Sequence, residues 1–282
     1  MEMNRIVDSI IMSLRGRAGL SKKSILVGQH TIVYLEGGAG ESVFLLHGFG
    51  ADKDNWNLFS RYLTKSYHVI APDFPGFGES SKIWSDQYNI AMQVERVHAF
   101  AKEIGLTRFH LVGNSMGGLI AGVYAARYPD DLLTLGLFDP AGVTEREPSQ
   151  FSLELEKGNN PLIVESVSDY DKLLDFTFVK PPSLPAPLKS YFAEMAVQRK
   201  DFYKKVFIEA TPGNQLEAMM REIRAKTLIL WGDSDRVLSV SSAQVLQKGI
   251  EKSKVIILKD CGHMPMLEKS EETARHYLEF IS

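Results

Sequence analysis

The chain has little of several features that mark particular classes of protein. Its one cysteine, Cys261, cannot form an internal disulfide or supply a thiolate zinc cluster. No apolar run approaches the roughly 18 residues of a membrane span, and the N-terminus lacks the continuous apolar stretch of a signal peptide. Lys and Arg number 32 against 35 Asp and Glu, and a net charge of -3 gives no general attraction to nucleic acid. We therefore expect no disulfide scaffold, no membrane-spanning helix and no nucleic-acid partner, and a protein that is cytoplasmic or bound to a membrane surface.

The remaining composition is that of an ordinary folded protein. Hydrophobic residues make up 44% and charged residues 24% of the 282 residues, values close to the globular average. This length fits one large α/β domain that carries an insertion.

Short runs rich in β-branched and aromatic residues predict buried strands. These runs lie at 31–35, 43–47, 69–71, 110–112, 133–138, 227–231 and 255–258. Helical patterns, such as 89–104 and 116–128, lie between most of them. Strands that alternate with helices predict a mostly parallel sheet covered by helices on both faces.

The alternation breaks between Gly142 and about Glu222, where prolines interrupt apolar helical stretches. Because open α/β sheets bind ligands at the carboxyl ends of their strands, we expect this insertion to form a helical lid there. A surface elaboration without a lid role is the alternative. The expected divisions are an N-terminal amphipathic segment at 1–24, a core in two parts at 25–141 and 223–282, and the lid at 142–222.

The N-terminal segment has apolar residues at helical spacing followed by basic residues. The apolar positions are Ile6, Val7, Ile10, Ile11 and Leu14, and the basic ones are Arg15, Arg17, Lys22 and Lys23. Residues 5–20 therefore predict an amphipathic helix that contacts a membrane surface. Its apolar face could instead cover a patch on its own domain or on a second copy of the chain in a homodimer.

The chemistry begins at 113–117, where Gly-Asn-Ser-Met-Gly follows a predicted strand and precedes a predicted helix. A nucleophilic serine on a sharp strand-to-helix turn needs small neighbours, and this context separates the pattern from a chance match. Ser115 is therefore the expected nucleophile. Its position at a helix N-terminus also directs backbone N–H groups toward any oxyanion.

A serine hydroxyl needs a base, and the base needs an orienting carboxylate. Of the seven histidines, His263 is the candidate because it lies in a turn directly after a strand. The turn after the preceding strand offers Asp233 and Asp235, and Asp139 follows an earlier strand. All three aspartates are candidates at this point, although a second acidic residue in a loop is more often a cap or turn residue.

The segment 47–50, His-Gly-Phe-Gly, follows another predicted strand. Oxyanion holes of this kind take one backbone N–H from the residue after the nucleophile and one from an early strand's loop. Met116 and Phe49 are the expected donors. We expect His47 to brace the loop rather than act as a base.

Taken together, these motifs resemble those of the α/β-hydrolase family. The similarity extends over roughly residues 30–282 and is carried by 47–49, 73–76, 110–118, 121–126, 140–142, 202–207, 231–232 and 261–263, with Lys53, Asp54, Trp56, Gly78 and Asp235. It is most specific for the group that includes monoacylglycerol lipases and bacterial membrane-anchored lipases and phospholipases.

The resemblance implies an eight-stranded sheet, no cofactor, no metal, and a triad of Ser115, Asp235 and His263. The chain departs from that group at its start. Those relatives are usually held in a membrane by an N-terminal hydrophobic helix, where this sequence has the shorter, interrupted segment 6–20.

The expected reaction is acyl transfer from a lipid-like carboxylic ester, such as a monoacylglycerol or a (lyso)phospholipid, to water. Apolar lid residues are candidates for contact with the acyl chain: Phe176, Phe178, Leu188, Phe192, Met195 and Phe207. One alternative is a carbon–carbon bond hydrolase of aromatic ring-cleavage products, which shares 113–118 and 261–263. Another is a binding protein on the same fold without catalysis.

Overall fold

The computed structural model describes residues 2–211 and 213–282, with side chains from residue 6 onward. Met1 and Pro212, which fall in the expected N-terminal and lid segments, lie outside the described residues. The strands are β1 (Leu20–Val27), β2 (His30–Gly37), β3 (Ser42–Leu46), β4 (His68–Pro72), β5 (Phe109–Asn114), β6 (Leu132–Phe138), β7 (Lys226–Gly232) and β8 (Ser253–Leu258).

The helices of the described chain lie between and after these strands. They are α1 (Glu2–Arg17), α2 (Asn57–Leu63), α3 (Ile90–Glu103), α4 (Met116–Arg127), α5 (Gln150–Glu156), α6 (Asp169–Thr177), α7 (Ala186–Ala210), α8 (Gln215–Met219), α9 (Ser241–Gly249), α10 (Pro265–Glu268) and α11 (Ser270–Ile281). Short 3-10 helices cover Lys53–Trp56, Pro129–Asp131 and Met220–Glu222.

The eight strands form one sheet in the order β1-β2-β4-β3-β5-β6-β7-β8. From β4 to β8 every neighbouring pair is parallel, whereas β2 runs antiparallel to both β1 and β4. The predicted α/β class, with a mostly parallel eight-stranded sheet, is confirmed. The parallel order brings the carboxyl ends of β3, β5, β6, β7 and β8 to one edge, where the motif residues follow.

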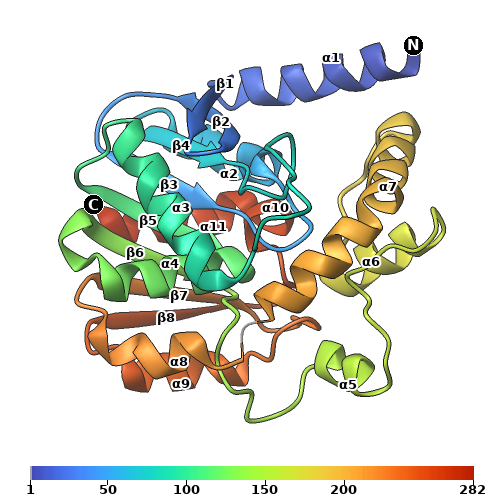
Figure 1. Ribbon diagram of the computed structural model, residues 1–282. Helices are drawn as coiled ribbons and strands as arrows, with labels where there is room; N and C mark the ends of the chain where they lie inside the picture. The colour runs from blue at the N-terminus through green and yellow to red at the C-terminus, as the bar shows by residue number, and fades with distance from the viewer. Residues whose placement is uncertain (1, 212) are drawn as a thin grey trace.

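Apolar cores fill both faces of the sheet, and Figure 1 shows helices on either side of it. One core packs α3 and α4 against the sheet through residues such as Phe100 and Leu119. The other packs α2 and α11 through residues such as Phe59 and Tyr277. Close packing of both cores keeps rigid the edge of the sheet that carries the motif residues.

The strand β1 differs from the sequence-based expectation, which placed residues 20–24 in the N-terminal segment. It pairs along its full length with β2, from Leu20 opposite Gly37 to Val27 opposite His30. Most of its residues are exposed or half-buried. Residues 21–24 are polar and exposed, and the apolar run at 25–27 is too short to predict a strand, so hydrophobicity alone did not reveal it.

The segment between β6 and β7 contains no strand in its described part, and α5, α6, α7 and α8 occupy it. Figure 1 shows α5, α6 and α7 together on one side of the sheet. The helix α7 runs for 25 residues, so the apolar stretch 191–197 noted in the sequence is one part of a much longer helix. Phe151 of α5 and Phe207 of α7 border the same cavity as Ser115, which places these helices over the carboxyl edge.

Candidate active site

Ser115 lies on a sharp turn between β5 and α4. Its backbone has φ 57° and ψ −121°, a strained conformation for a residue with a side chain. The glycines on either side permit the turn. A Cβ on Gly113 would lie 2.1 Å from the Gly117 carbonyl oxygen, and one on Gly117 would lie 2.3 Å from that of Leu46.

Backbone hydrogen bonds hold the strained turn in place. The Ser115 N–H donates to the Phe138 carbonyl oxygen at 3.0 Å, and the Ser115 carbonyl oxygen accepts from the N–H groups of Leu119 and Ala141, each at 3.0 Å. These bonds join β5, α4 and the end of β6. Backbone strain of this kind persists where the surroundings over-determine it, as they do here.

His263 and Asp235 lie together in the turns that follow β8 and β7. The His263 Nδ1 atom is 2.7 Å from the Asp235 Oδ2 atom, and both side chains are almost fully buried. The Asn114 side chain, one residue before Ser115, donates to the His263 carbonyl oxygen at 3.0 Å and to that of Phe138 at 3.1 Å. The histidine turn is therefore tied directly to the serine turn, and Nε2 of His263 is the ring nitrogen left for the serine side.

The three candidate aspartates have different surroundings. Asp235 accepts hydrogen bonds from the Val237 and Leu238 N–H groups on Oδ1 while Oδ2 faces His263. Asp233 is exposed and instead accepts from the Ser234 hydroxyl. Asp139 is fully buried beside Asp235, and the acid and base atoms of Asp139, Asp235 and His263 all lie within 4.8 Å of one another.

The other histidines have polar partners in other parts of the fold or lie away from the serine turn. His30 contacts Asp86, His68 contacts Glu36, His98 contacts Tyr124, His110 contacts Thr134, and His276 lies near Glu272 and Glu279 on α11. None of these contacts involves Ser115 or Asp235.

The loop after β3 packs directly against Ser115. A Cβ on Gly48 would lie 3.1 Å from the Ser115 Cβ, so the next residue, Phe49, presents its backbone beside the serine. Neither the Phe49 nor the Met116 N–H donates a hydrogen bond to another described group. Both donors are therefore available to a ligand atom.

His47 braces this loop from inside the core. Its Nδ1 atom lies 2.7 Å from the Gly48 carbonyl oxygen and its Nε2 atom 3.1 Å from the Phe74 N–H. This pattern requires a neutral ring with the proton on Nδ1. Complete burial lowers the pKa of His47 to about 4, which keeps the ring in that form at neutral pH.

Ser115 opens into a cavity of about 450 Å³ whose walls are mostly apolar. Of the six lid residues expected to contact substrate, Phe207 lines this cavity. Phe178 and Leu188 are buried in the lid, Phe192 and Met195 are half-buried on α7, and Phe176 borders a different cavity. Those five do not line the serine cavity, because α6 and the first half of α7 lie away from it.

Most residues of the cavity wall were not predicted from the sequence. The wall includes Leu119, Ala141, Val143, Phe151, Leu155, Leu162, Ala210, Val237 and Leu238. Phe151 and Leu155 are four residues apart on α5, the spacing of one helix face, and this pair was the signal available in the sequence. Val237 and Leu238 follow the acid turn and carry no motif.

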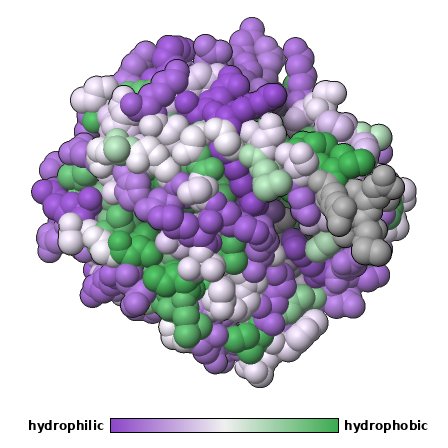
Figure 2. All heavy atoms as spheres, turned by 90° about the horizontal axis from the view of Figure 1, so that it is seen from above, coloured by the Kyte–Doolittle hydropathy of each residue, from purple (hydrophilic) through white to green (hydrophobic). Residues whose placement is uncertain are grey.

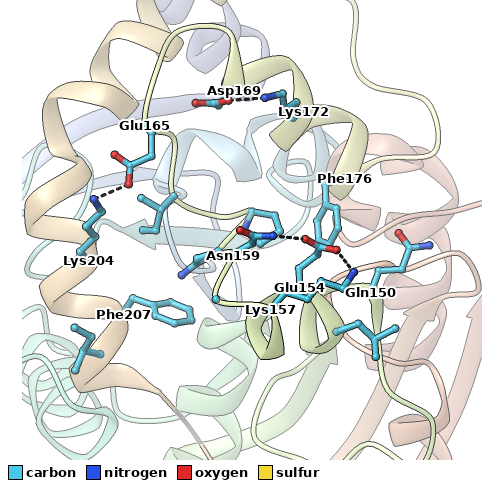
Figure 3. A pocket seen from close by; sticks show the side chains of 16 residues that line it. Gln150, Glu154, Lys157, Asn159, Glu165, Asp169, Lys172, Phe176, Lys204 and Phe207 are labelled. Carbon is cyan, nitrogen blue, oxygen red and sulfur yellow. Dashed lines mark hydrogen bonds and ion pairs between the residues drawn. The ribbon is translucent and has the colours of Figure 1, made fainter.

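A second, larger cavity of about 1090 Å³ lies among the lid helices and does not include Ser115. Figure 3 shows its charged rim, where Glu154 contacts Lys157, Asp169 contacts Lys172 and Glu165 contacts Lys204. Phe207 borders both cavities, and α5 forms a wall between them. We assign the chemistry to the smaller cavity because it holds the serine.

Comparisons with known proteins agree with this geometry. A family model described as alpha/beta hydrolase fold matches residues 41–270. The chain is 38% identical over 281 residues to Lipase 1 of Psychrobacter immobilis, covering 98% of this chain and 88% of that one. It is 33% identical over 253 residues to a monoacylglycerol lipase of Rattus norvegicus, covering 86% and 75%.

Among solved structures, the chain is similar to the crystal structure of a membrane phospholipase A, described as a bacterial virulence factor. The TM-score is 0.97 and the identity 48%, with 99% of this chain and 91% of that chain covered. The fold, the serine turn and these matches together show that the chain belongs to the α/β-hydrolase family.

Proposed function

We propose that the protein is a serine hydrolase that cleaves lipid-like carboxylic esters through an acyl-enzyme on Ser115. The observation that carries this proposal is a serine on a strained turn that lines an apolar cavity, with Asn114 tying this turn to the turn of a buried histidine–aspartate pair. The lipases and the phospholipase among its relatives support a lipid ester as the substrate.

In the acylation step, the Ser115 Oγ atom attacks the ester carbonyl carbon while His263 Nε2 takes the hydroxyl proton. The tetrahedral intermediate then collapses, the carbon–oxygen bond to the alcohol breaks, and His263 returns the proton to the leaving oxygen. Water activated by the same histidine hydrolyses the acyl-enzyme and releases the acid. Asp235 orients His263 and stabilises its charged form throughout.

The Phe49 and Met116 N–H groups hold the negative oxygen of each tetrahedral intermediate. Their free donors on either side of the serine support this role. A preorganised donor of this kind lowers the transition-state free energy by about 3 kcal/mol.

The acyl chain of the substrate occupies the 450 Å³ cavity, with Phe151, Leu155 and Phe207 along its length. Apolar walls stabilise a hydrocarbon chain by removing it from water. The substrate headgroup is glycerol or a phosphate ester of it, as in the monoacylglycerol and phospholipid substrates for which the relatives are named.

Purified wild type and Ser115→Ala should be compared on p-nitrophenyl esters of increasing chain length, on a monoacylglycerol and on a lysophospholipid. We expect hydrolysis that depends on Ser115 and rises from acetate to medium or long chains. Hydrolysis limited to acetate and butyrate would contradict the assignment of the cavity to a lipid chain. Cleavage of a ring-cleavage dienoate with no ester hydrolysis would favour the carbon–carbon bond hydrolase.

We also propose that α1 contacts a lipid surface. Among the described residues, no helix has both the length and the apolar character to cross a bilayer. Ile6 and Met12 on α1 are 50% and 62% exposed, whereas Val7 is buried against the protein. Figure 2 looks down on the side where α1 lies and shows hydrophobic residues in separate patches among hydrophilic ones.

Co-sedimentation with anionic lipid vesicles tests this contact. We expect Ile6→Ser/Met12→Ser to lose vesicle binding, while Ser9→Ala/Ser13→Ala, which changes two exposed residues of the same helix, keeps it. A smaller particle in solution for the first variant without any vesicle effect would identify a homodimer instead. No change in either measurement would remove both roles for α1.

A further inference from the structure

Asp139 is a buried carboxyl group that the proposed reaction does not use. It follows β6, its backbone has φ 45°, and its residue is fully buried. Its Oδ1 atom accepts the Gly232 N–H at 2.9 Å, while its Oδ2 atom is buried and has no hydrogen-bond partner. A buried charged oxygen without a donor is costly, so the state of this group needs an explanation.

The neighbour of Asp139 is the acid of the proposed triad. Asp235 accepts three hydrogen-bond contacts, from the Val237 N–H, the Leu238 N–H and His263 Nδ1. Asp139 accepts one. Two carboxylates this close in a dry site cannot both be ionised at low cost, and the one with fewer donors is the one that takes a proton.

We propose that Asp139 carries a proton and donates it in a hydrogen bond to Asp235, so that the two carboxyl groups share one negative charge. This inference rests on the proposed function, because it makes Asp139 a positioning residue for the triad acid. The proton satisfies the unpartnered Oδ2 atom and removes the repulsion between the two groups.

The surrounding charges agree with this assignment. Burial raises the pKa of Asp139 well above its ordinary value, and the nearby charges of Asp235 and Glu268 raise it further; the Gly232 N–H opposes them. Cys261 and His263 also lie near Asp139. Burial and the same carboxyl groups raise the pKa of the Cys261 thiol, so it stays neutral.

The net charge of the Asp139–Asp235 pair affects the protonation state of His263, the base of the proposed reaction. Two ionised carboxylates beside His263 would favour an imidazolium in the resting enzyme, which cannot take the Ser115 proton. The Asp139 hydrogen bond also holds the Asp235 carboxylate with Oδ2 toward His263. Asp139 thus keeps the base neutral and oriented before the substrate arrives.

The activity test compares Asp139→Asn with Asp139→Ala. Asparagine reproduces the neutral acid because its amide donates to Asp235 and its oxygen accepts from Gly232, so we expect turnover within about 5-fold of wild type. Alanine removes the donor, and we expect kcat to fall by about 50-fold with little change in KM. Where alanine does not fold, Asp139→Ser replaces it, and Asp233→Asn is the matched control for an aspartate outside the pair.

The dependence of kcat/KM on pH, on its acidic side, distinguishes a protonated Asp139 that positions Asp235 from an Asp139 that is ionised beside His263. We expect its midpoint in Asp139→Asn to stay within about 0.3 pH units of wild type, because no charge is lost. A midpoint that moves down by about one unit or more would mean that Asp139 is normally ionised beside His263, and this would overturn the proposal.

Proton binding can also be measured without any activity, by urea unfolding of the Ser115→Ala background from pH 5 to 8. A folded-state pKa above the ordinary 3.8 means that the folded protein keeps a proton that the unfolded chain has lost. The stability contributed by that proton is present below 3.8 and is lost as pH rises. We therefore expect the stability of Asp139→Asn to rise relative to that of its parent as the pH rises, by up to about tenfold in the unfolding equilibrium constant per pH unit until the folded-state pKa of Asp139 is reached.

If the stability difference between Asp139→Asn and its parent does not change with pH, Asp139 is ionised in the folded protein. This result would overturn the shared proton even if ester hydrolysis proceeds as proposed. Conversely, absence of ester hydrolysis with a pH-dependent difference would contradict the proposed function and leave the shared proton standing.

Discussion

Asp233 and Asp235 lie two residues apart in one turn but have opposite surroundings. Asp235 is buried against His263, whereas Asp233 is exposed and bonded to Ser234. We expect Asp235→Asn to lower kcat by about 10³-fold to 10⁴-fold, because the amide favours the wrong histidine tautomer. Asp233→Asn should retain kcat within about 3-fold, because Asp233 does not contact His263 and the asparagine oxygen can still accept from the Ser234 hydroxyl and the Cys261 N–H. Steady-state kinetics on a p-nitrophenyl ester measure both, and equal losses would show that the acid is assigned wrongly.

At the residue scale, the sequence predicted Ser115 and His263 because each lies in a turn directly after a strand, whereas Asp235 was separated from Asp233 and Asp139 by the family resemblance rather than by its own pattern. The structure brings Asp235 and His263 into hydrogen-bond contact and ties their turns to the serine turn. The contact between Asp139 and Asp235 could not be predicted, because it depends on how closely the turns after β6 and β7 approach. No local pattern encodes that distance.

At the scale of elements, α5 separates two cavities, and two leucines on opposite sides of it offer a matched test. Leu155 lines the serine cavity and Leu153 the larger one, and both are about 40% exposed. We expect Leu155→Trp to lower kcat/KM for a dodecanoate ester by about 10-fold or more relative to a butyrate ester, because the larger ring fills the space of the acyl chain. Leu153→Trp should leave this ratio within about 2-fold of wild type.

Equal effects of the two substitutions on the chain-length ratio would contradict the placement of the acyl chain. A thermal melt of each variant controls for damage to the lid helices, and we expect melting temperatures close to that of wild type because both leucines are partly exposed.

The elements differ in how far the sequence predicted them. The buried parallel strands and the helices α3 and α4 have strong apolar patterns, and their predictions agree with the structure within a few residues. The edge strand β1 was missed because its pairing, rather than its hydrophobicity, makes it a strand. Within the lid, the helices were expected but their packing was not, so five of the six suggested acyl contacts lie outside the serine cavity.

At the scale of the whole molecule, a network of charges joins the N-terminal segment to the core. Arg15 of α1 bonds to Asp54 and Glu79, Lys22 of β1 bonds to Glu79, and the buried Lys53 bonds to Glu79 and Asp73. These residues come from four separate segments of the chain. The network therefore fixes the end of α1 and the start of β1 against the loop that follows β4, next to the loop that carries Phe49.

Glu79 is the centre of this network and gives it a pH dependence. Burial alone would raise the pKa of Glu79, but the hydrogen bonds and charges of Lys22 and Lys53 lower it from 4.5 to about 2. The stability that its ionised form contributes is therefore present above pH 4.5 and is lost as pH falls from 4.5 to 2. We expect Glu79→Gln to be about 1 kcal/mol less stable than wild type at pH 7, a value discounted because the glutamate is 41% exposed.

Urea unfolding at pH 7, 5.5, 4.5 and 3.5 measures this difference. It should stay constant down to about pH 4.5 and then shrink, because the unfolded wild-type chain begins to bind a proton at Glu79 while the folded carboxylate stays ionised. Glu156→Gln, at the exposed end of α5, is the control and should show no such trend. A Glu79→Gln difference that grows as the pH falls would mean that the carboxyl is held neutral in the folded protein, and the ion pair of Arg15 with Asp54 would then be the one that joins this network to α1.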